Sequence, residues 1–309
     1  MNYAIIDLGS NTIRLCIYRY EENKIVTVIR QKEVAGLAGY VKKNMLELDG
    51  IRKACDILCE FKEIAIRFVE QNEIHVFATA SLRGILNQEQ VLEMIRQDTG
   101  LLPEVLSGEY EARLDYIGAS HFMECGEGIL IDIGGASTEL VRFENARPVR
   151  FASMPVGCLS LYTGFIGKMI PTENERKNIK KEIREQLDNL GWSPEENFPL
   201  MIGVGGTVRA AHKLSRSLFS LPKGQNEMSA GFVKKILNEL KNSDSEIYRT
   251  VYKLIPERTL TIVPGLMILR EAIKRFNCEN ILVSDYGVRE GYLIDRILKE
   301  GDATHACGG

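Results

Sequence analysis

In two short segments of the 309-residue sequence, an aspartate is followed by one apolar residue and then by glycine and hydroxyl-bearing residues. The first is Asp7-Leu-Gly-Ser-Asn-Thr12 and the second is Asp132-Ile-Gly-Gly-Ala-Ser-Thr138. Small residues let several backbone N–H groups line a concavity that suits phosphate oxygens, and the aspartate suits Mg²⁺ beside a phosphate. A tight hairpin turn whose aspartate bonds its own backbone explains either segment alone. The occurrence of two such segments favours phosphate binding.

A third glycine turn, Gly203-Val-Gly-Gly-Thr207, leaves a predicted strand and enters a predicted helix, with Thr207 as the expected cap. Helix N-termini attract anions, so Gly205 and Gly206 are candidate phosphate-binding residues. A purely structural turn explains the same sequence equally well. The turn does not match the dinucleotide fingerprint, and no lysine follows it as a P-loop requires.

Two carboxylates, Glu109 and Glu111, lie in the predicted first turn of a helix that Ser107 is expected to cap. Acidic residues at that place often only complement the helix dipole. Residues two positions apart point in different directions, so at most one of the two carboxylates is expected to face a site. Arg83 follows another strand and is suited to bidentate phosphate contact, although a surface salt bridge is the alternative.

The elements that must position these residues alternate between strand and helix. Residues 3–7, 13–20 and 24–33 read as an antiparallel meander, followed by a helix over 47–71 and a strand over 74–80. Asn87 and Gln90 predict a capping box for the next helix, and a strand at 104–106 precedes a helix at 109–122. Strands alternating with helices predict an α/β fold with a largely parallel sheet.

The pattern restarts at Gly128, which predicts a duplicated domain. We expect strands at 129–133, 139–144, 148–154, 200–204 and 280–284, and helices at 172–190, 207–219, 229–240, 264–276 and 288–299. The tail over 301–309 is expected to be disordered.

Composition excludes several classes of protein. The sequence has 39 basic and 42 acidic side chains, a formal net charge of -3 and 45% hydrophobic residues. It therefore lacks a global basic field for nucleic acid or membrane surfaces, and it is unlike a disordered chain. No stretch approaches 18 apolar residues, and no basic region followed by an apolar run opens the chain. We expect a cytoplasmic enzyme with no nucleic-acid or membrane partner.

One charged run, Arg176-Lys-Asn-Ile-Lys-Lys181, lies in a predicted helix with glutamates interleaved. Such a run is usually a solvated helix face. The alternative is a basic wall that leads a polyanionic substrate to the phosphate-binding loops.

Six motifs together resemble the exopolyphosphatase and guanosine pentaphosphate phosphohydrolase family, a branch of the actin, sugar kinase and Hsp70 superfold. They occur in the family's order and cover nearly the whole chain. They are Ala4-Ile-Ile-Asp-Leu-Gly-Ser-Asn11, Ala78-Thr-Ala-Ser-Leu-Arg83, Ser107-Gly-Glu-Tyr-Glu-Ala-Arg113, Ile131-Asp-Ile-Gly-Gly-Ala-Ser-Thr-Glu139, Gly203-Val-Gly-Gly-Thr207 and Val283-Ser-Asp-Tyr-Gly-Val-Arg-Glu-Gly291.

The resemblance implies two duplicated actin-like (ribonuclease H-like) domains with an active-site cleft between them. It implies one domain over 1–124 with a returning C-terminal helix at 288–309, and a second domain over 125–287. It also implies Mg²⁺ as cofactor, polyphosphate or guanosine pentaphosphate (pppGpp) as substrate, and a homodimer.

The resemblance assigns roles residue by residue. Glu111 matches the glutamate that activates the attacking water, whereas Glu109 occupies a variable position. Asp132 and Glu139 match acidic residues of metal binding and catalysis, with Asp7 and Asp132 expected at the metal. The residues expected to bind phosphate come from both loops, the third turn and the strand end before Arg83. They are Gly9, Ser10, Asn11, Arg83, Gly134, Gly135, Ala136, Ser137, Thr138, Gly205 and Gly206.

The chain departs from the family pattern in two ways. Ala136 replaces a third glycine, which narrows the conformational range of the loop. Larger members carry a further C-terminal helical region, so we expect no strong preference for very long chains here.

Two rival functions fit the same motifs. A small-molecule kinase of the superfold also needs paired phosphate loops, and a catalytically weak sensor of alarmones or polyphosphate fits the change at Ala136.

Overall fold

The computed structural model describes residues 1–22, 24–123, 126–192, 197–242 and 245–299. Contacts within the chain group into two compact units. Unit 1 comprises Met1–Glu111 and the chain from Leu293, and unit 2 comprises Ala112–Tyr292. The predicted tail at 301–309 lies outside the described residues.

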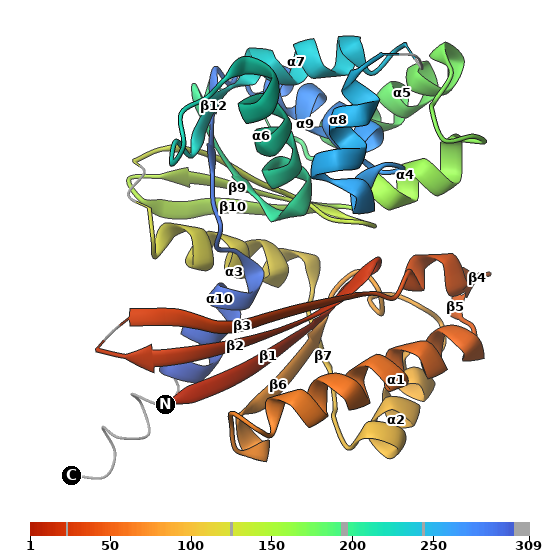
Figure 1. Cartoon of the computed structure of the whole chain (residues 1–309), viewed down its shortest axis with the longest axis vertical. Helices are drawn as coiled ribbons and strands as arrows, with labels where there is room; N and C mark the ends of the chain where they lie inside the picture. The colour runs from red at the N-terminus through yellow and green to blue at the C-terminus, as the bar shows by residue number, and fades with distance from the viewer. Residues whose placement is uncertain (23, 124–125, 193–196, 243–244, 300–309) are drawn as a thin grey trace. The chain divides into compact units, whose positions relative to one another are not determined.

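Unit 1 is built on a five-stranded sheet in the order β3-β2-β1-β6-β7 (Figure 1). The first three strands form the predicted antiparallel meander, and β6 and β7 run parallel to β1. The strands are β1 (Asn2–Leu8), β2 (Thr12–Glu21), β3 (Lys24–Val34), β6 (Ile74–Ala78) and β7 (Glu104–Val105).

Smaller elements complete unit 1. The helices α1 and α2 bury one apolar face each in a core that includes Leu58 and Ile95. Their bounds, with those of the short segments, are η1 (Leu37–Tyr40), β4 (Val41–Lys42), β5 (Met45–Leu46), α1 (Leu48–Ala65), η2 (Gln71–Glu73), α2 (Gln88–Thr99) and η4 (Leu293–Leu298).

Unit 2 contains a six-stranded sheet in the order β10-β9-β8-β11-β13-β12. Again a meander opens the unit, and β11 and β13 run parallel to β8. The strands are β8 (Gly128–Ile133), β9 (Thr138–Glu144), β10 (Arg147–Met154), β11 (Leu200–Val204), β12 (Glu227–Ser229) and β13 (Asn280–Val283).

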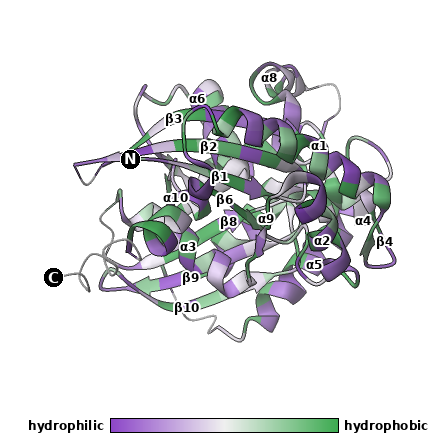
Figure 2. Cartoon of the chain, turned by 90° about the horizontal axis from the view of Figure 1, so that it is seen from below, coloured by the Kyte–Doolittle hydropathy of each residue, from purple (hydrophilic) through white to green (hydrophobic). Residues whose placement is uncertain are grey.

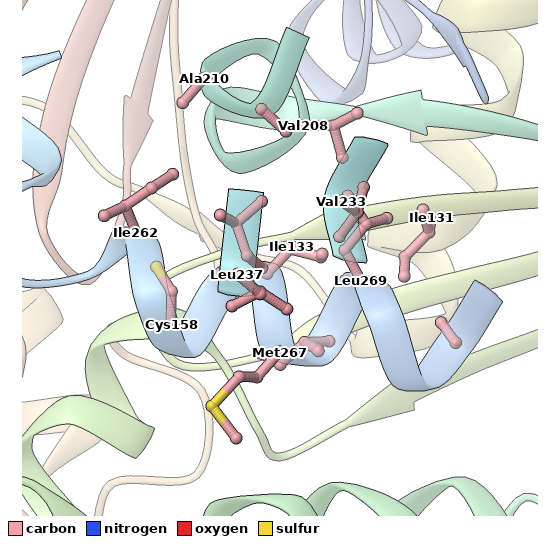
Figure 3. Packing of buried hydrophobic residues seen from close by; sticks show 14 of the residues in the cluster. Ile131, Ile133, Cys158, Val208, Ala210, Val233, Leu237, Ile262, Met267 and Leu269 are labelled. Carbon is pink, nitrogen blue, oxygen red and sulfur yellow. The ribbon is translucent and has the colours of Figure 1, made fainter. Parts of the chain in front are cut away.

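Helices cover this second sheet and bury its core. Figure 3 shows Val208, Val233 and Leu269 from three helices meeting Ile131 and Ile133 of β8. The helices, with α3 shared between the units, are α3 (Gly108–Ser120), α4 (Cys158–Phe165), α5 (Glu173–Asn189), α6 (Gly205–Phe219), α7 (Ala230–Glu239), α8 (Ile247–Leu254), η3 (Pro256–Arg258), α9 (Ile262–Arg275) and α10 (Val288–Tyr292). In Figure 2 many helices show both a hydrophobic and a hydrophilic side, as amphipathic helices on a core should.

The two sheets share one connectivity: each opens with a three-strand meander and adds two parallel strands beside its first strand. This confirms the predicted duplicated α/β fold. Neither sheet is largely parallel as predicted, because the meander strands and β12 pair antiparallel with their neighbours. Among the described residues, no helix is long and apolar enough to cross a membrane.

Several local predictions were wrong. The helix predicted over 47–71 ends at Ala65, and the final helix divides into α10 and a π-helical segment at Leu293–Leu298. Asn87 precedes α2 without capping it, because its side chain bonds the backbone of Leu46 instead. Thr207 does not cap α6, which begins at Gly205, because its hydroxyl donates to the Ile133 carbonyl.

Candidate functional site

The turn after β1 presents backbone donors in unit 1. The carbonyl oxygens of Ser10 and Asn11 accept hydrogen bonds from Ala38 and Gly36, each at 2.9 Å, which fixes the turn. Within the described residues, the backbone N–H groups of Ser10 and Asn11 donate to no protein group. Such N–H groups are suitable donors for an anion.

Asp7 at the end of β1 is 3% exposed and pairs with Arg14 of β2, with Arg14 Nη1 3.1 Å from Asp7 Oδ2. The pairing follows from register, because the two residues lie directly opposite each other in the meander. Arg14 offsets the charge of the carboxylate, so Asp7 attracts a cation less strongly than an unpaired aspartate would.

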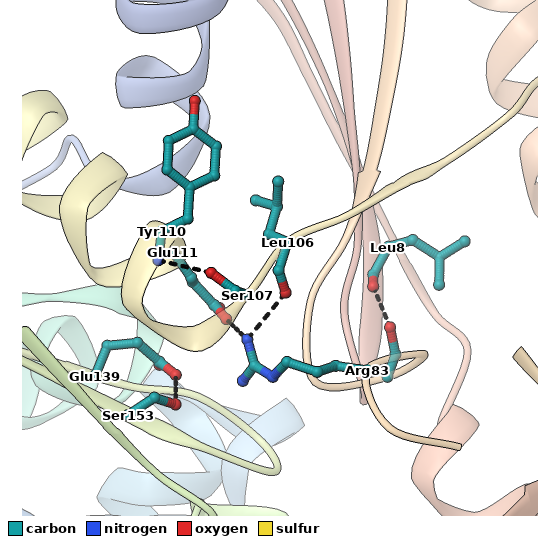
Figure 4. Close-up of polar contacts among 9 residues, drawn as sticks. Leu8, Arg83, Leu106, Ser107, Tyr110, Glu111, Glu139 and Ser153 are labelled. Atoms are coloured by element: carbon teal, nitrogen blue, oxygen red, sulfur yellow. Dashed lines mark hydrogen bonds and ion pairs between the residues drawn. The ribbon is translucent and has the colours of Figure 1, made fainter. Parts of the chain in front are cut away.

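Glu111 and Arg83 meet in unit 1 (Figure 4). Arg83 Nη1 lies 2.8 Å from Glu111 Oε2 and 3.3 Å from the Leu106 carbonyl oxygen. Glu111 is 9% exposed, whereas Glu109 is exposed. Of the two carboxylates, Glu109 is therefore the solvated one, and Glu111 is the one that is shielded and hydrogen-bonded by an arginine.

Both partners are anchored by their own elements. Ser107 caps α3 as predicted, since its Oγ accepts from the Tyr110 N–H at 3.2 Å, and this sets the first turn that carries Glu111. The Ser81 hydroxyl donates to the Leu8 carbonyl, which ties the loop before Arg83 to the end of β1. Figure 4 shows the contact between Ser107 and Tyr110.

The loop after β8 presents backbone donors in unit 2, and the first turn of α4 hydrogen-bonds to its carbonyl groups. The Cys158 N–H donates to the Gly134 carbonyl at 2.9 Å, and the N–H groups of Leu159 and Ser160 donate to the Gly135 carbonyl. Within the described residues, the N–H groups of Gly135, Ala136 and Ser137 donate to no protein group. With its carbonyls held by α4, the loop keeps three consecutive donors for an anion.

Ala136 fits this loop without backbone strain. Ala136 is not one of the described non-glycine residues that adopt a positive φ. Its backbone therefore does not need the conformational freedom of the glycine it replaces.

Two carboxylates face each other across β8 and β9. Asp132 and Glu139 are register partners, so their side chains lie on the same face of the sheet. Glu139 is 1% exposed and accepts a hydrogen bond from Ser153 Oγ at 2.8 Å, visible in Figure 4.

The third glycine turn lies beside them at the start of α6. A Cβ on Gly205 would approach Asp132 Oδ1 to 1.9 Å, and Gly205 has φ +77°. A Cβ on Gly206 would approach Arg258 Nη2 to 1.7 Å, so a carboxylate and a guanidinium both contact this turn. In unit 2 the structure thus brings together Asp132, Glu139, the loop after β8 and the start of α6.

These residues fit Mg²⁺ in part. Mg²⁺ usually binds one or two carboxylates together with waters and substrate phosphates, and Asp132 with Glu139 provides such a pair. The described residues contain no cluster of three or more acidic, histidine or cysteine ligands, so they form no all-protein cage. Asp7 fits less well because of Arg14.

Sequence reasoning missed two residues of this arrangement. Arg258 lies 52 positions beyond Gly206 in the sequence, and nothing in its local pattern marks it. Gly157 contacts the phosphate-loop candidate directly, since a Cβ there would lie 2.4 Å from the Gly135 carbonyl oxygen. The signal in the sequence was a glycine at the position just before helix α4, a helix that the sequence analysis did not predict.

Two curated relatives of this chain carry the same name. A guanosine-5'-triphosphate,3'-diphosphate pyrophosphatase of Vibrio parahaemolyticus is 28% identical over 97% of this chain and 60% of its own length. One from Photobacterium profundum is 27% identical over 96% of this chain and 59% of its own length. The chain thus spans about three fifths of these curated relatives.

Solved structures share the fold. The Ppx/GppA family member of Aquifex aeolicus is 27% identical, with a TM-score of 0.79 over 97% of this chain and 98% of its own. An exopolyphosphatase from Cytophaga hutchinsonii, at 21% identity, has a TM-score of 0.83 over 97% of this chain and 98% of its own. The two α/β units are therefore actin-like domains. The model of the Ppx/GppA phosphatase family matches residues 16–300, and the chain belongs to that family.

Proposed function

We propose that this chain is a phosphohydrolase that releases the terminal orthophosphate of inorganic polyphosphate, of pppGpp, or of both. The observation that carries the proposal is the Glu111 carboxylate, nearly buried and oriented by Arg83 in a chain of this family. The backbone donors of Ser10, Asn11, Gly135, Ala136 and Ser137 support it.

In the proposed mechanism, Glu111 accepts a proton from a water whose oxygen attacks the terminal phosphorus. The bond from that phosphorus to the bridging oxygen breaks, and the electron pair leaves with the shortened chain. Backbone N–H groups of the two loops stabilise charge on the phosphoryl oxygens, which is the main contribution in phosphoryl transfer. A guanidinium has five N–H groups, so Arg83 can contact phosphate while its Nη1 holds Glu111.

Asp132 and Glu139 are the residues proposed to hold Mg²⁺, with Asp7 as a weaker candidate. When bound, Mg²⁺ would neutralise charge on the phosphate oxygens. The turns that present the N–H donors are shaped by the remaining predicted residues of the loops, Gly9, Gly134 and Thr138. Gly205 and Gly206, at the start of α6, are proposed as further phosphate-binding residues.

Glu111→Gln tests the assignment of the base. The amide keeps the size of the side chain but accepts no proton, so we expect phosphate release from polyphosphate and pppGpp to fall by about 10²- to 10⁴-fold. Released orthophosphate is the measurement.

Glu109→Gln is the matched control, because it makes the same change two positions away on an exposed side chain. It should leave the rate within about twofold, as surface changes usually do. Unchanged phosphate release in Glu111→Gln would remove the base assignment.

The proposal includes a homodimer, as the sequence resemblance implies. Light scattering on the purified chain measures its molar mass and tests this part separately.

A further inference from the structure

The first turn of α3, which carries Glu111, has contacts on two sides within unit 1. On one side Arg83 donates to Glu111 Oε2 and to the Leu106 carbonyl. Figure 4 shows the side chain of Tyr110, the residue before Glu111, pointing away from Arg83. Consecutive residues of a helix do not face the same way, so Tyr110 can make a contact that Glu111 cannot.

Tyr110 contacts the π-helical segment η4. Its hydroxyl donates to Asp295 Oδ2 at 3.1 Å, although the two residues lie 185 positions apart in the sequence. The other carboxylate oxygen, Asp295 Oδ1, lies 3.0 Å from Lys299 Nζ, so the acceptor itself is held in place. The side chain of Asp295 is 13% exposed. A hydrogen bond to such a shielded carboxylate is stronger than one between neutral groups.

Arg296, the next residue of η4, contacts the ring of the same tyrosine. The centre of its guanidinium lies 5.2 Å from the centre of the Tyr110 ring, which is within the range of a cation–π interaction. Its Nη2 also pairs with Glu104 Oε1 of β7. Two consecutive residues of η4 therefore contact both ends of the short segment between β7 and the first turn of α3.

The segment η4 can act as a fixed support. Its first two residues, Leu293 and Ile294, are buried. Its wide π-helical turn is a geometry that is rare in proteins and frequent at functional sites. The support starts from η4 and reaches the turn that carries Glu111 through Tyr110.

Tyr110 remains a hydrogen-bond donor at neutral pH. Burial, together with the hydrogen bond to Asp295 and the charge of that carboxylate, raises the pKa of the Tyr110 hydroxyl to about 12, against the attraction of Arg296. The hydroxyl therefore keeps its proton wherever Glu111 is ionised and able to accept one.

We propose that Tyr110 and Asp295 are positioning residues for the proposed base, because their hydrogen bond fixes the first turn of α3 and with it the Glu111 carboxylate. The role rests on the proposed function, in which Arg83 contacts phosphate as well as Glu111. An arginine shared between the two holds the carboxylate less firmly. A second contact that involves no substrate group keeps the carboxylate in place during the reaction.

Tyr110→Phe tests this role, because it keeps the ring over which Arg296 lies and removes only the hydroxyl. We expect kcat for orthophosphate release from the better of the two proposed substrates to fall about tenfold, since a misplacement of about 1 Å can cost about 10²-fold. KM should stay within about twofold, because the proposed phosphate donors are unchanged. Tyr252→Phe is the matched control: it removes a hydroxyl that bonds Met169 Sδ on an exposed side chain of unit 2, and both constants should stay the same.

Asp295 separates the hydrogen bond from other effects of the segment. Asp295→Ala removes the acceptor and should lower kcat as much as Tyr110→Phe does. The double variant should be no slower than either single variant, because both lose the same bond. Asp295→Asn keeps an oxygen that accepts from the Tyr110 hydroxyl, so its kcat should return to within about threefold of the unchanged chain.

Hydrogen exchange read by mass spectrometry measures the contact without any activity. Exchange over residues 106–114 should be faster in Tyr110→Phe and unchanged in Tyr252→Phe. A chain that releases no orthophosphate in any variant would contradict the proposed function, while the exchange would still decide whether the contact fixes the turn.

Three outcomes would overturn the positioning role. The first is an unchanged kcat in Tyr110→Phe, and the second is a loss that appears only in KM. The third is an equal loss in Asp295→Asn and Asp295→Ala, which would assign the effect to the charge of Asp295.

Discussion

Glu109 and Glu111 lie in the same helix turn but differ in the exposure of their side chains. The two carboxylates are chemically near-identical in the sequence, yet one is exposed and the other is 9% exposed and bonded to Arg83. Helical geometry predicted that they diverge, but not which of them faces inward. Glu111 is the carboxylate that meets Arg83, which comes from the loop between β6 and α2.

Gly157 gives a prediction at the same scale. In Gly157→Ala the new Cβ would lie within 2.5 Å of the Ala136 backbone nitrogen and 2.4 Å of the Gly135 carbonyl, so the loop must move. Because the loop supplies the proposed phosphate donors, kcat for phosphate release should fall on the order of 10²-fold, the typical cost of losing one such donor. Steady-state kinetics with polyphosphate measures the loss.

Gly164→Ala is the control for that prediction, since it lies in the same helix α4 and a Cβ there meets nothing within 4 Å. It should retain full activity and slightly raise helix stability. Equal activity of the two variants would show that contact between α4 and the loop does not position the donors.

At the scale of elements, the short hairpin of β4 and β5 holds the loop that follows Arg83. The Asn87 side chain accepts from the Leu46 N–H and donates to the Leu46 carbonyl, both at 3.0 Å. Asn44 adds a bond from its side chain to the Gly84 carbonyl and accepts the Leu86 N–H at its own carbonyl. Sequence reasoning had assigned Asn87 to helix capping.

Asn87→Ala should therefore loosen the hairpin more than it shortens α2. It leaves both backbone groups of Leu46, which is 2% exposed, without their partner, at a cost of about 1–3 kcal/mol. Hydrogen exchange read by mass spectrometry should become faster over residues 41–46. Gln97→Ala removes an exposed side-chain bond on α2 and should change little. Faster exchange confined to the first turn of α2 would restore the capping role.

At the scale of the molecule, duplication explains why one sequence pattern occurs twice. Each sheet opens with the same meander, so each unit presents a turn after its first strand, at Asp7 and at Asp132. The sequence motifs do not separate polyphosphate from pppGpp, because both end in the same phosphoanhydride.

A comparison of kcat/KM for tripolyphosphate, long-chain polyphosphate, pppGpp and ATP at one Mg²⁺ concentration tests function at this scale. The proposed function predicts orthophosphate release from polyphosphate, pppGpp or both, because both end in the phosphoanhydride on which the loops and Glu111 are proposed to act. ATP-dependent phosphorylation of an added acceptor without polyphosphate hydrolysis would favour a kinase. Tight binding without turnover would favour a sensor.

The sequence by itself determined the periodic features of this protein. Alternating strands and helices, the restart near Gly128 and the glycine-rich turns are local patterns, and they predicted the duplicated α/β fold and both phosphate-loop candidates. Local patterns also located the cap at Ser107.

Only the tertiary structure decided which side chains meet. Arg83 reaches Glu111 across 28 positions, Arg258 reaches Gly206 across 52, and α4 reaches back to support the loop at Gly135. These contacts depend on how strands and helices pack, and packing joins residues far apart in the sequence with no local signature.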